Sequence, residues 1–422
     1  MSARFRNLTL KAVFVNRFFH PDHSATSQIL SELAFALAAA GWEVHVVTAR
    51  QRYDDPRAQL PPRATLSGVQ VHRVWTTSFG RGSLPGRALD YLTFYCSAFF
   101  ALLGVLRRGD VVVAKTDPPL ISVIAAAAAR LRGAALVNWL QDLFPEVAEG
   151  LGVKALGGMV GKAVRALRDR SLRGARSNVV IGDRMAEIVA RIAPGPKVIH
   201  NWAVGDLVEP IPLERNAVRR EWELGERFVV GYSGNLGRAH EFDTILAAIE
   251  VLREDDDVLF LFIGAGKQLE EPRRSIAQRG LGHRVMFQPY QPKERLAQSL
   301  ASVNAHLVTL QPSMEGLIVP SKFYGIAAAA RPTLFVGDPD GEIPRLLRRF
   351  DCGYAVATGD ADALVACIRE LRADPSRCER VGANARAALE HHFDRAHAVA
   401  RWSAVLAEAA GMSEADRAQG TA

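Results

Sequence analysis

The sequence predicts an α/β protein made of two doubly wound, Rossmann-like domains. Short runs rich in valine, isoleucine and phenylalanine alternate with amphipathic helical runs along almost the whole chain, a pattern typical of parallel sheets covered by helices. A charged stretch at 203–227 interrupts this alternation near the middle of the chain, and we interpret it as a linker. Because ligands of such folds bind beyond the carboxyl ends of the strands, we expect the two domains to face each other across a cleft that holds the site.

The expected elements follow one another in a regular order. The helical pattern at 24–41 ends on Gly41, a residue type that commonly follows the last helical residue. In the first half, the expected strands lie at 11–16, 43–49, 110–115, 135–140, 178–182 and 197–202. The alternation restarts after the charged stretch, where the expected strands lie at 228–233, 257–266, 284–290, 305–310, 332–338 and 353–358.

These runs divide the chain into a first domain at 1–205 and a second domain at 206–392. A final helical pattern at 393–411 carries apolar residues at helical spacing, and we expect it to pack back on the first domain. The remaining residues, 412–422, are expected to form a disordered tail.

The composition is that of a mildly basic protein. The formal net charge is +7 and the pI is about 9.4, which suits a phosphate-bearing substrate, an anionic membrane face or a nucleic acid. The four cysteines form no C-x-x-C pair and no metal-ligand spacing, so we expect reduced thiols in a cytoplasmic protein. The N-terminal residues do not resemble a cleavable signal peptide.

A glycine-containing turn in the second half separates an expected strand from an expected helix. The residues are GYSGNLGRAHEF, at 231–242. Unpaired backbone N–H groups and a helix N-terminus converge on such turns, and both attract anions. The G-x-G-x-x-G spacing of dinucleotide-binding turns is absent, and a tight turn without a ligand is the alternative interpretation.

Several stretches together resemble the family 4 glycosyltransferases of the GT-B fold. They are FFHPDHSATSQILSELAFALAAAGWEVHVVTAR, VVGYSGNLGRAHEFDTILAAI, FLFIGAGKQLEE, FQPYQPKERLAQSLASVNAHLVTL and VPSKFYGIAAAARPTLFVGDPDGEI. They extend from about residue 11 to 408 and are most similar to the colanic-acid type, the branch that builds exopolysaccharide and O-antigen units. The resemblance implies retaining transfer of a hexosyl or N-acetylhexosaminyl group from a UDP-sugar, or else a GDP-sugar, without a metal or other cofactor.

The resemblance also indicates which residues stabilise the departing nucleoside diphosphate, whose negative charge grows in the transition state. The backbone at Gly234 and Gly237 is expected to meet the distal phosphate, with Arg238 and Lys322 as the catalytic cations. Ser321 precedes Lys322 in VPSKFYG and is expected to cap a helix or to donate to a phosphate. The alternative for Lys322 is a solvated lysine at the start of a helix.

The chain departs from the family pattern at the donor site. Asn235 and His240 stand where many relatives carry Arg and Lys, so we expect them to hydrogen-bond the phosphates, with His240 cationic when a diphosphate is near. Of the family's paired glutamates, Glu315 fits the first loosely, and Gly325 occupies the second place. Glu342 could bind the ribose instead, or it could simply stabilise the N-terminus of a helix.

Two strand-end loops of the second domain are expected to hold the nucleotide base. Gly264 belongs to one loop and Tyr290 to the other, where Tyr290 could stack on the base or only pack. A D-x-D pattern at Asp338–Asp340 binds a metal in another glycosyltransferase fold, but here we interpret it as a turn. No cluster of histidine and cysteine suggests zinc.

The first domain is expected to hold the acceptor. Asp142 follows an expected strand, where relatives often carry a His-Asp pair, and it could orient the acceptor hydroxyl, accept its proton or play a structural part. Ser24 and Thr26 open the helix after the first strand, where small side chains leave room for the diphosphate or the sugar.

Two stretches of the first domain indicate contact with an anionic membrane surface. The run Tyr91–Leu106 is very apolar, yet it is shorter than the roughly 20 residues of a spanning helix, so we interpret it as a buried or half-inserted helix. The stretch 153–176 has a two-faced pattern that suits a bilayer surface, with an ordinary solvated helix as the alternative. One face carries Leu156, Val160, Ala163, Val164 and Leu167, and the other carries Lys162, Arg165, Arg168, Arg173 and Arg176.

These observations favour a glycosyltransferase of cell-surface polysaccharide biosynthesis, covering exopolysaccharide and lipopolysaccharide. Its acceptor would be a lipid-linked saccharide or another membrane-associated molecule at the inner face of the cytoplasmic membrane. A GT-B-fold epimerase that acts on UDP-N-acetylglucosamine is the alternative, but an epimerase needs no basic membrane helix. Nucleic-acid binding would explain the charge alone, and the arginines are not interleaved with stacking aromatic residues.

Overall fold

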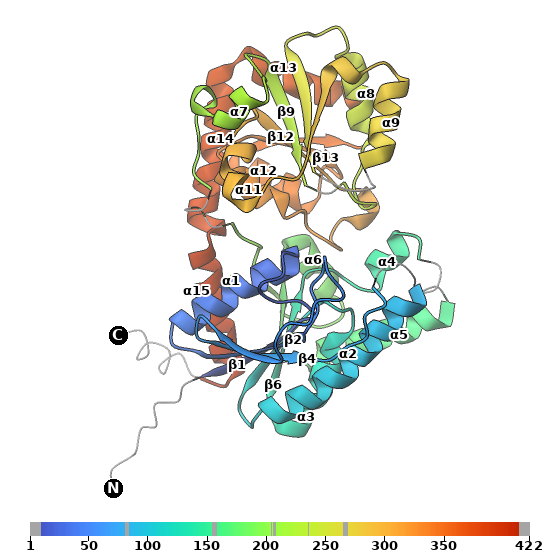
Figure 1. Ribbon diagram of the computed structural model, residues 1–422, viewed down its shortest axis with the longest axis vertical. Helices are drawn as coiled ribbons and strands as arrows, with labels where there is room; N and C mark the ends of the chain where they lie inside the picture. Colours follow the sequence, from blue (N-terminus) through green and yellow to red (C-terminus); the bar gives the residue numbers. More distant parts are fainter. Residues whose placement is uncertain are drawn as a thin grey trace. The chain divides into compact units, whose positions relative to one another are not determined.

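The computed structural model describes residues 10–80, 84–153, 158–203, 205, 208–234, 236–264 and 269–412. The chain forms two compact units: the first comprises the residues up to His200 and again from Ala398, and the second spans Asn201–His397. Each unit contains one predominantly parallel sheet covered by helices (Figure 1). The doubly wound α/β architecture predicted from the sequence is therefore confirmed.

The first unit is built on an eight-stranded sheet with the order β3-β4-β2-β1-β5-β6-β7-β8. Its strands are β1 Lys11–Val15, β2 Glu43–Ala49, β3 Arg63–Leu66, β4 Val69–Val74, β5 Val111–Lys115, β6 Ala135–Leu140, β7 Ser177–Val180 and β8 Lys197–Val198. The central strands β1 and β5 are buried on both faces, which is why their sequences are continuous apolar runs rather than alternating ones.

The hairpin of β3 and β4 is absent from the sequence prediction. These two strands pair antiparallel, and β4 pairs parallel with β2. Ser67 and Gly68 join them with φ values of 46° and 82°, the backbone signs of a tight two-residue hairpin turn. The alternation of buried Val69 and Val71 with exposed Gln70 is the signal that marks this strand.

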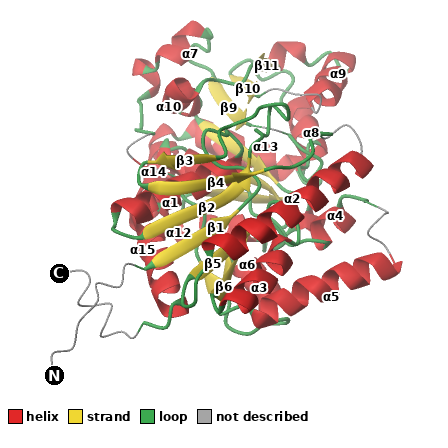
Figure 2. Cartoon of the chain, turned by 60° about the horizontal axis from the view of Figure 1, so that its bottom comes forward, coloured by secondary structure: helices red, strands yellow, loops and turns green. Residues whose placement is uncertain are grey.

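The helices of the first unit lie on both faces of its sheet. They are α1 Ala25–Ala39, α2 Leu84–Val105, α3 Ile121–Arg132, α4 Glu146–Gly150, α5 Gly158–Gly174 and α6 Asp183–Ala190. Helix α1 ends as expected, with Gly41 at φ 90° and its N–H bonded to the Ala38 carbonyl. Right-handed crossovers from β4 to β5 and from β5 to β6 place α2 and α3 on one face, and α5 packs beside α3 (Figure 2).

Helix α2 is longer than the predicted apolar run, because it begins at Leu84 rather than at Tyr91. Its stretch Pro85–Val105 is the one helix of the described residues that is long and apolar enough to cross a membrane, judged by length and composition alone. One face of α2 is core: Phe94, Ala98 and Leu102 are fully buried against β1, β2 and β5. The buried-helix interpretation therefore holds for that face.

The predicted two-faced pattern of 153–176 is only partly present in helix α5. Residues 154–157, including Leu156, lie outside the described residues. Arg168 is buried, and its guanidinium donates to Glu146 at 2.8 and 3.0 Å and to the Phe144 carbonyl at 3.1 Å. Arg165 donates to Glu146 and Glu149. Both arginines are paired with α4, and buried Arg168 is not available to a membrane. Val160 and Leu167 are exposed, at 57% and 47%.

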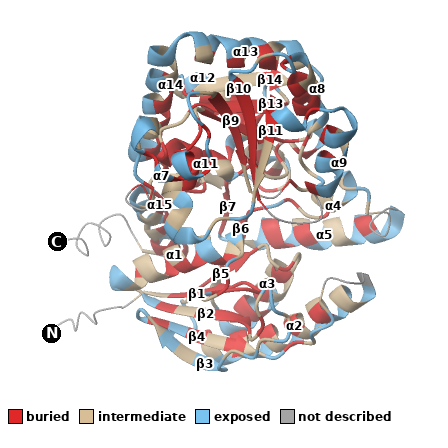
Figure 3. Ribbon diagram, turned by 45° about the horizontal axis from the view of Figure 1, so that its top comes forward, coloured by how far each residue is buried: buried red, intermediate tan, exposed pale blue. Residues whose placement is uncertain are grey.

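The second unit is built on a six-stranded, parallel sheet with the order β11-β10-β9-β12-β13-β14. Its strands are β9 Phe228–Ser233, β10 Val258–Ile263, β11 Val285–Gln288, β12 Ala305–Thr309, β13 Thr333–Gly337 and β14 Gly353–Ala357. Its helices are α7 Ala217–Glu221, α8 Asp243–Val251, α9 Glu270–Gln278, α10 Leu296–Leu300, α11 Lys322–Ala328, α12 Glu342–Phe350, α13 Ala361–Ala373 and α14 Pro375–Ala388. Buried residues concentrate in the strands β9, β10 and β13 (Figure 3).

Much of the predicted linker at 203–227 is an integral part of the second unit. Val218, Trp222 and Leu224 are buried against β9 and β10. Arg219, which is 7% exposed, donates to the carbonyls of Gly225, Arg227 and Ser302. The stretch resembles a linker because it contains many charged residues. Arg219 is nevertheless buried, because backbone carbonyls accept its hydrogen bonds.

The last helix, α15, spans Arg395–Ala409 and enters the first unit at Ala398. Its Trp402 is fully buried and lies 4.7 Å from Trp139 of β6 between ring centres. The C-terminal helix therefore closes the core of the unit that the N-terminal half begins. The predicted tail at 412–422 lies outside the described residues from 413 onward.

Candidate active site

Two glycines bring the ends of β9 and β10 close together. Gly234 follows β9 with φ 111°, a conformation that other residues rarely adopt. A Cβ at Gly264, just past β10, would lie 2.7 Å from the Gly234 carbonyl oxygen, and a Cβ at Gly234 would lie 3.0 Å from Cε of Lys322. The fold thus gathers three predicted donor-site residues at the carboxyl end of the second sheet.

Lys322 lies over this turn as the first residue of α11. Its ammonium group donates to the Tyr232 hydroxyl and sits 4.0 Å from the centre of that ring. Burial lowers the pKa of Lys322 to about 7, because an ammonium group loses its hydration there. Lys322 is therefore not the solvated lysine of the alternative interpretation, and an anion brought to the turn would favour its charged form.

His240 lies beside Lys322 in the loop after β9. Its Nδ1 is 2.8 Å from the Thr309 carbonyl oxygen, so Nδ1 carries the proton and donates it. Burial, followed by the nearby charge of Lys322, lowers the His240 pKa to about 4. In this state His240 is a neutral acceptor through Nε2, and it would become the expected cation only when the negative charge of a bound diphosphate raises its pKa.

The other predicted donor-site residues lie on the same unit with varied exposure. Arg238 and Tyr290 are exposed, and Gly237 accepts from the His240 N–H at 2.9 Å to close the turn. Asn235 lies outside the described residues. Ser321 occupies the cap position of α11 but makes no side-chain cap bond, so the capping part of its prediction is wrong.

Glu315 and Glu342 are neighbours across two segments. Glu315 accepts from the Glu342 backbone N–H at 2.8 Å, so its carboxylate caps α12 from outside that helix. A Cβ at Gly341 would collide with the Glu315 carboxylate, which explains a glycine at that point. Glu342 is 1% exposed, an arrangement that favours the helix-terminus interpretation over ribose binding.

The D-x-D pattern forms a turn, as interpreted from the sequence. The Asp338 carboxylate accepts from the Asp340 N–H at 2.9 Å, and the Asp338 carbonyl accepts from Gly341 at 3.0 Å. Within the residues that the structure describes, no three histidine, cysteine or acidic side chains are grouped as metal ligands.

Asp142 stands at the carboxyl end of β6 in the first unit. Its side chain reaches solvent, yet the surrounding protein, and then the negative charge of Asp117, raise its pKa to about 6. Lys115 opposes this rise. Asp142 is therefore a carboxylate whose basicity is raised toward neutral pH.

The residues after β1 are fixed by buried polar contacts. Lys115 is fully buried, donates to the Thr26 carbonyl at 2.8 Å and lies 3.9 Å from the centre of the Trp139 ring. The Ser24 hydroxyl and N–H both donate to Asp22. These contacts hold the start of α1 near the strand ends.

Sequence reasoning missed Tyr232, Thr309, Lys115 and Asp117. Tyr232 and Lys115 lie within strand-like runs, where their patterns match packing residues. Of these four residues, only Lys115 could have been recognised from the sequence. It ends the apolar run VVVAK, and a charged side chain in a buried strand needs a partner.

The two Rossmann-like sheets in one chain, with a glycine turn at the strand ends of the second, are the architecture of the GT-B fold. A solved structure of Anabaena Alr3699/HepE in complex with UDP is similar to this chain, with a TM-score of 0.70, 15% identity and coverage of 94% of this chain and 100% of that one. The family model "Glycosyl transferases group 1" matches residues 214–388, and "Glycosyl transferase 4-like domain" matches residues 25–202.

Two relatives agree with these matches. WbjE of Pseudomonas aeruginosa, named as a glycosyltransferase, is 31% identical over 273 residues, which cover 63% of this chain and 66% of the relative. WcaI of Escherichia coli K12, named as a colanic acid biosynthesis glycosyl transferase, is 25% identical over 369 residues, which cover 83% of this chain and 89% of the relative. The chain belongs to the family 4 glycosyltransferases of the GT-B fold.

Proposed function

We propose that the protein transfers a hexosyl or N-acetylhexosaminyl group, with retention of configuration, from a UDP-sugar to a membrane-associated saccharide acceptor. The pathway would be the assembly of cell-surface polysaccharide. The named role of WcaI in colanic acid biosynthesis and the UDP bound to HepE support this choice. A GDP-sugar is the second donor to be tested.

The observation that carries the proposal is the contact between Lys322 and the Gly234 turn. The departing diphosphate would lie against the turn, beside the side chain of Lys322. Lys322 would bind the charge that develops on the phosphate oxygen, in a site where burial makes such an interaction strong. Arg238 extends from the same loop and is exposed, so it could bind the other phosphate.

The acceptor side of the proposal rests on Asp142. A carboxylate with a raised pKa can orient an acceptor hydroxyl and accept its proton near neutral pH. The nearby Lys115 and Asp117 adjust its charge in opposite directions. We propose that no metal takes part, since Lys322 and the turn supply the stabilisation.

The test is a transfer assay with the purified protein. UDP- and GDP-sugars labelled in the sugar are incubated with and without bacterial lipid extract, each with and without EDTA. We expect transfer to lipid-soluble product from one UDP-sugar, unchanged by EDTA. Conversion of UDP-N-acetylglucosamine to an epimer without an acceptor would support the alternative, and loss of transfer in EDTA restored by Mn²⁺ would contradict the metal-free part.

We also propose that α2, α3 and α5 dock the first unit on an anionic membrane surface. These helices carry exposed large apolar side chains, namely Leu89, Leu92, Phe100, Leu131, Met159, Val160 and Leu167. Exposed Lys162, Arg170 and Arg173 of α5 add positive charge. Among the described residues of these helices, the acids are Asp90, which is buried, and Asp169, which pairs with Arg168. Apolar and basic groups without free acids suit an interfacial surface.

Replacing Val160 and Leu167 together with aspartate is expected to weaken binding to phosphatidylglycerol-containing vesicles at least tenfold. Each exposed side chain would lose an apolar contact of about 1–2 kcal/mol and gain a repulsive charge. Co-sedimentation measures the effect, and high salt should release part of the wild-type protein. Val251→Asp, at a side chain that is also 47% exposed but lies on α8, is the matched control. The membrane proposal would be contradicted if the wild-type protein did not co-sediment with the vesicles. It would also be contradicted if the double variant bound them as tightly as the wild type.

A further inference from the structure

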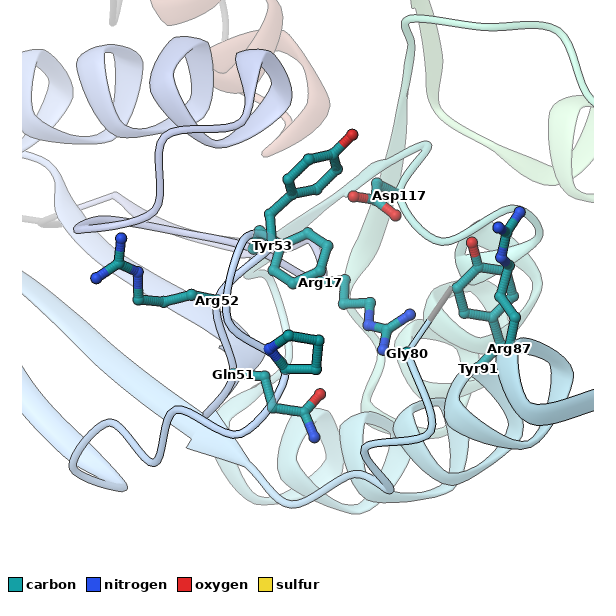
Figure 4. A pocket seen from close by; sticks show the side chains of 10 residues that line it. Arg17, Gln51, Arg52, Tyr53, Gly80, Arg87, Tyr91 and Asp117 are labelled. Atoms are coloured by element: carbon teal, nitrogen blue, oxygen red, sulfur yellow. The ribbon is translucent and has the colours of Figure 1, made fainter. Parts of the chain in front are cut away.

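The first unit contains a cavity of about 220 Å³ at the carboxyl ends of its strands (Figure 4). Its lining comes from segments after β1, β2, β4 and β5 and from the start of α2, and it includes Arg17, Arg52, Tyr53, Arg87, Tyr91 and Asp117. Ligand pockets usually enclose about 300–1,000 Å³, so this cavity suits one part of a substrate rather than a whole one. The strand ends are where this fold class places ligands.

Arg17 is an unusual wall for such a cavity, because its side chain is buried yet only partly paired. It is 8% exposed, its Nη2 donates to Asp90 over a long 3.4 Å, and its Nε has no hydrogen-bond partner. Two aromatic rings hold the guanidinium in place, with the Phe18 and Tyr91 ring centres at 5.3 and 5.2 Å. A buried guanidinium N–H without an acceptor destabilises the folded protein. A ligand oxygen that accepts from it would therefore be bound favourably.

Arg17 shares the Asp90 carboxylate with other hydrogen-bond donors. The Thr77 hydroxyl donates to it at 2.7 Å, and the backbone N–H groups of Phe79 and Gly80 donate at 3.1 and 3.0 Å. Asp90 is thus a positioning residue that ties the loop after β4 to Arg17. The Nε of Arg17, which lines the cavity, stays without an acceptor.

Arg87 supplies a second cation from the first turns of α2. Its Nε is buried and also lacks a hydrogen-bond partner, and its side chain lies beside Tyr91 on the cavity wall. Arg52 lines the other side but is paired with Asp54 at 2.7 Å. Asp117 is the one carboxylate among the lining residues, and it can accept from a sugar hydroxyl.

We propose that this cavity binds an anionic group of the acceptor, a phosphate ester or a sugar carboxylate, between Arg17 and Arg87. Guanidinium groups bind both kinds of oxyanion in the same forked geometry. Tyr53 and Tyr91 add aromatic faces for the adjoining sugar ring. The inference rests on the proposed function, because it names the chemical class of that reaction's acceptor.

The test measures binding of inorganic pyrophosphate, D-glucuronate and neutral D-glucose to the full chain by calorimetry. It is done in a Lys322→Ala background, so that the proposed phosphate site of the second unit does not contribute. We expect one of the two anions to bind at least tenfold more tightly than glucose. Binding of pyrophosphate alone identifies a phosphate ester as the source, and binding of glucuronate alone identifies a uronic acid.

Arg87→Gln is expected to weaken that binding at least tenfold, while Arg57→Gln leaves it unchanged. Arg57 is an exposed arginine on the neighbouring loop and does not line the cavity. Arg17→Lys is the second variant, and it should weaken binding while thermal unfolding shows a folded protein. Anion binding that is equal in Arg87→Gln and wild type, or no preference for either anion over glucose, overturns the proposal. Binding of UDP and GDP to the chain with Lys322 intact is scored separately, so a failure of the donor proposal is distinguished from a failure here.

Discussion

Replacing Lys322 with alanine is expected to lower the rate of sugar transfer about 30- to 1,000-fold at saturating donor. The reason is the loss of a charge-assisted contact to the departing phosphate in a partly buried site, which costs on the order of 2–4 kcal/mol in transition-state free energy. Lys322→Arg should recover only part of the rate, since the planar guanidinium cannot occupy the same place beside Gly234 and Tyr232.

The fold should survive this substitution. Burial lowers the Lys322 pKa from 10.5 to about 7, so the unfolded chain binds more protons than the folded one between these values and stability rises with pH across that window. At low pH the charged Lys322 therefore destabilises the folded state, and the alanine variant lacks this destabilising charge. Lys293→Ala, at an exposed lysine of the same unit, serves as the control. Normal transfer by a folded Lys322→Ala protein would exclude Lys322 from the chemistry.

The turn after β9 could be predicted from the sequence because its signals are local. Gly234 and Gly237 stand between a strand and a helix, and the VPSK stretch marks a helix start, so both parts of the site could be recognised separately. The turn and the helix start lie close together because β9 and β12, the strands that precede them, are parallel neighbours. Their carboxyl ends lie at the same edge of the sheet.

The burial of charged side chains could not be predicted in the same way. Arg168 looks like a surface arginine in the helical pattern, but its partner Glu146 lies on another helix, 22 positions away. His240 looks like a phosphate ligand, but the Thr309 carbonyl fixes its tautomer from 69 positions away. In each case the decisive partner is distant in sequence, and helical periodicity carries no information about it.

Arg17 shows the same limit at the cavity of the first unit. A single arginine after a strand has no distinguishing pattern in a chain with 52 lysines and arginines. Its role depends on Asp90 of α2 and on the loop after β4, which the sequence prediction did not recognise as a strand end. The residues that we propose to bind the acceptor therefore become recognisable only when the sheet is assembled.

The affinity for a nucleoside diphosphate is expected to fall as the pH rises from 7 to 9. Below pH 7 Lys322 is mostly protonated before the ligand arrives, whereas above its pKa of about 7 the free protein must take up a proton to form the contact. If the bound phosphate holds the lysine charged at pH 9, the loss is up to about 50-fold, since about half of the free lysine is charged at pH 7 and about 1% at pH 9. In the free protein His240, with its pKa of about 4, is neutral throughout this range.

Calorimetric titration with UDP and GDP in buffers of different ionisation enthalpy measures both the affinity and the proton uptake. The range from pH 7 upward also avoids the second ionisation of the terminal phosphate, which lies near pH 6. We expect close to one proton taken up per nucleotide bound at pH 8.5 by the wild-type protein, and none by Lys322→Ala. Lys322→Arg should bind with little pH dependence, because its guanidinium stays charged throughout. If the wild-type affinity were constant from pH 7 to 9 and no proton were taken up, Lys322 would not be the group that binds the phosphate of the nucleotide.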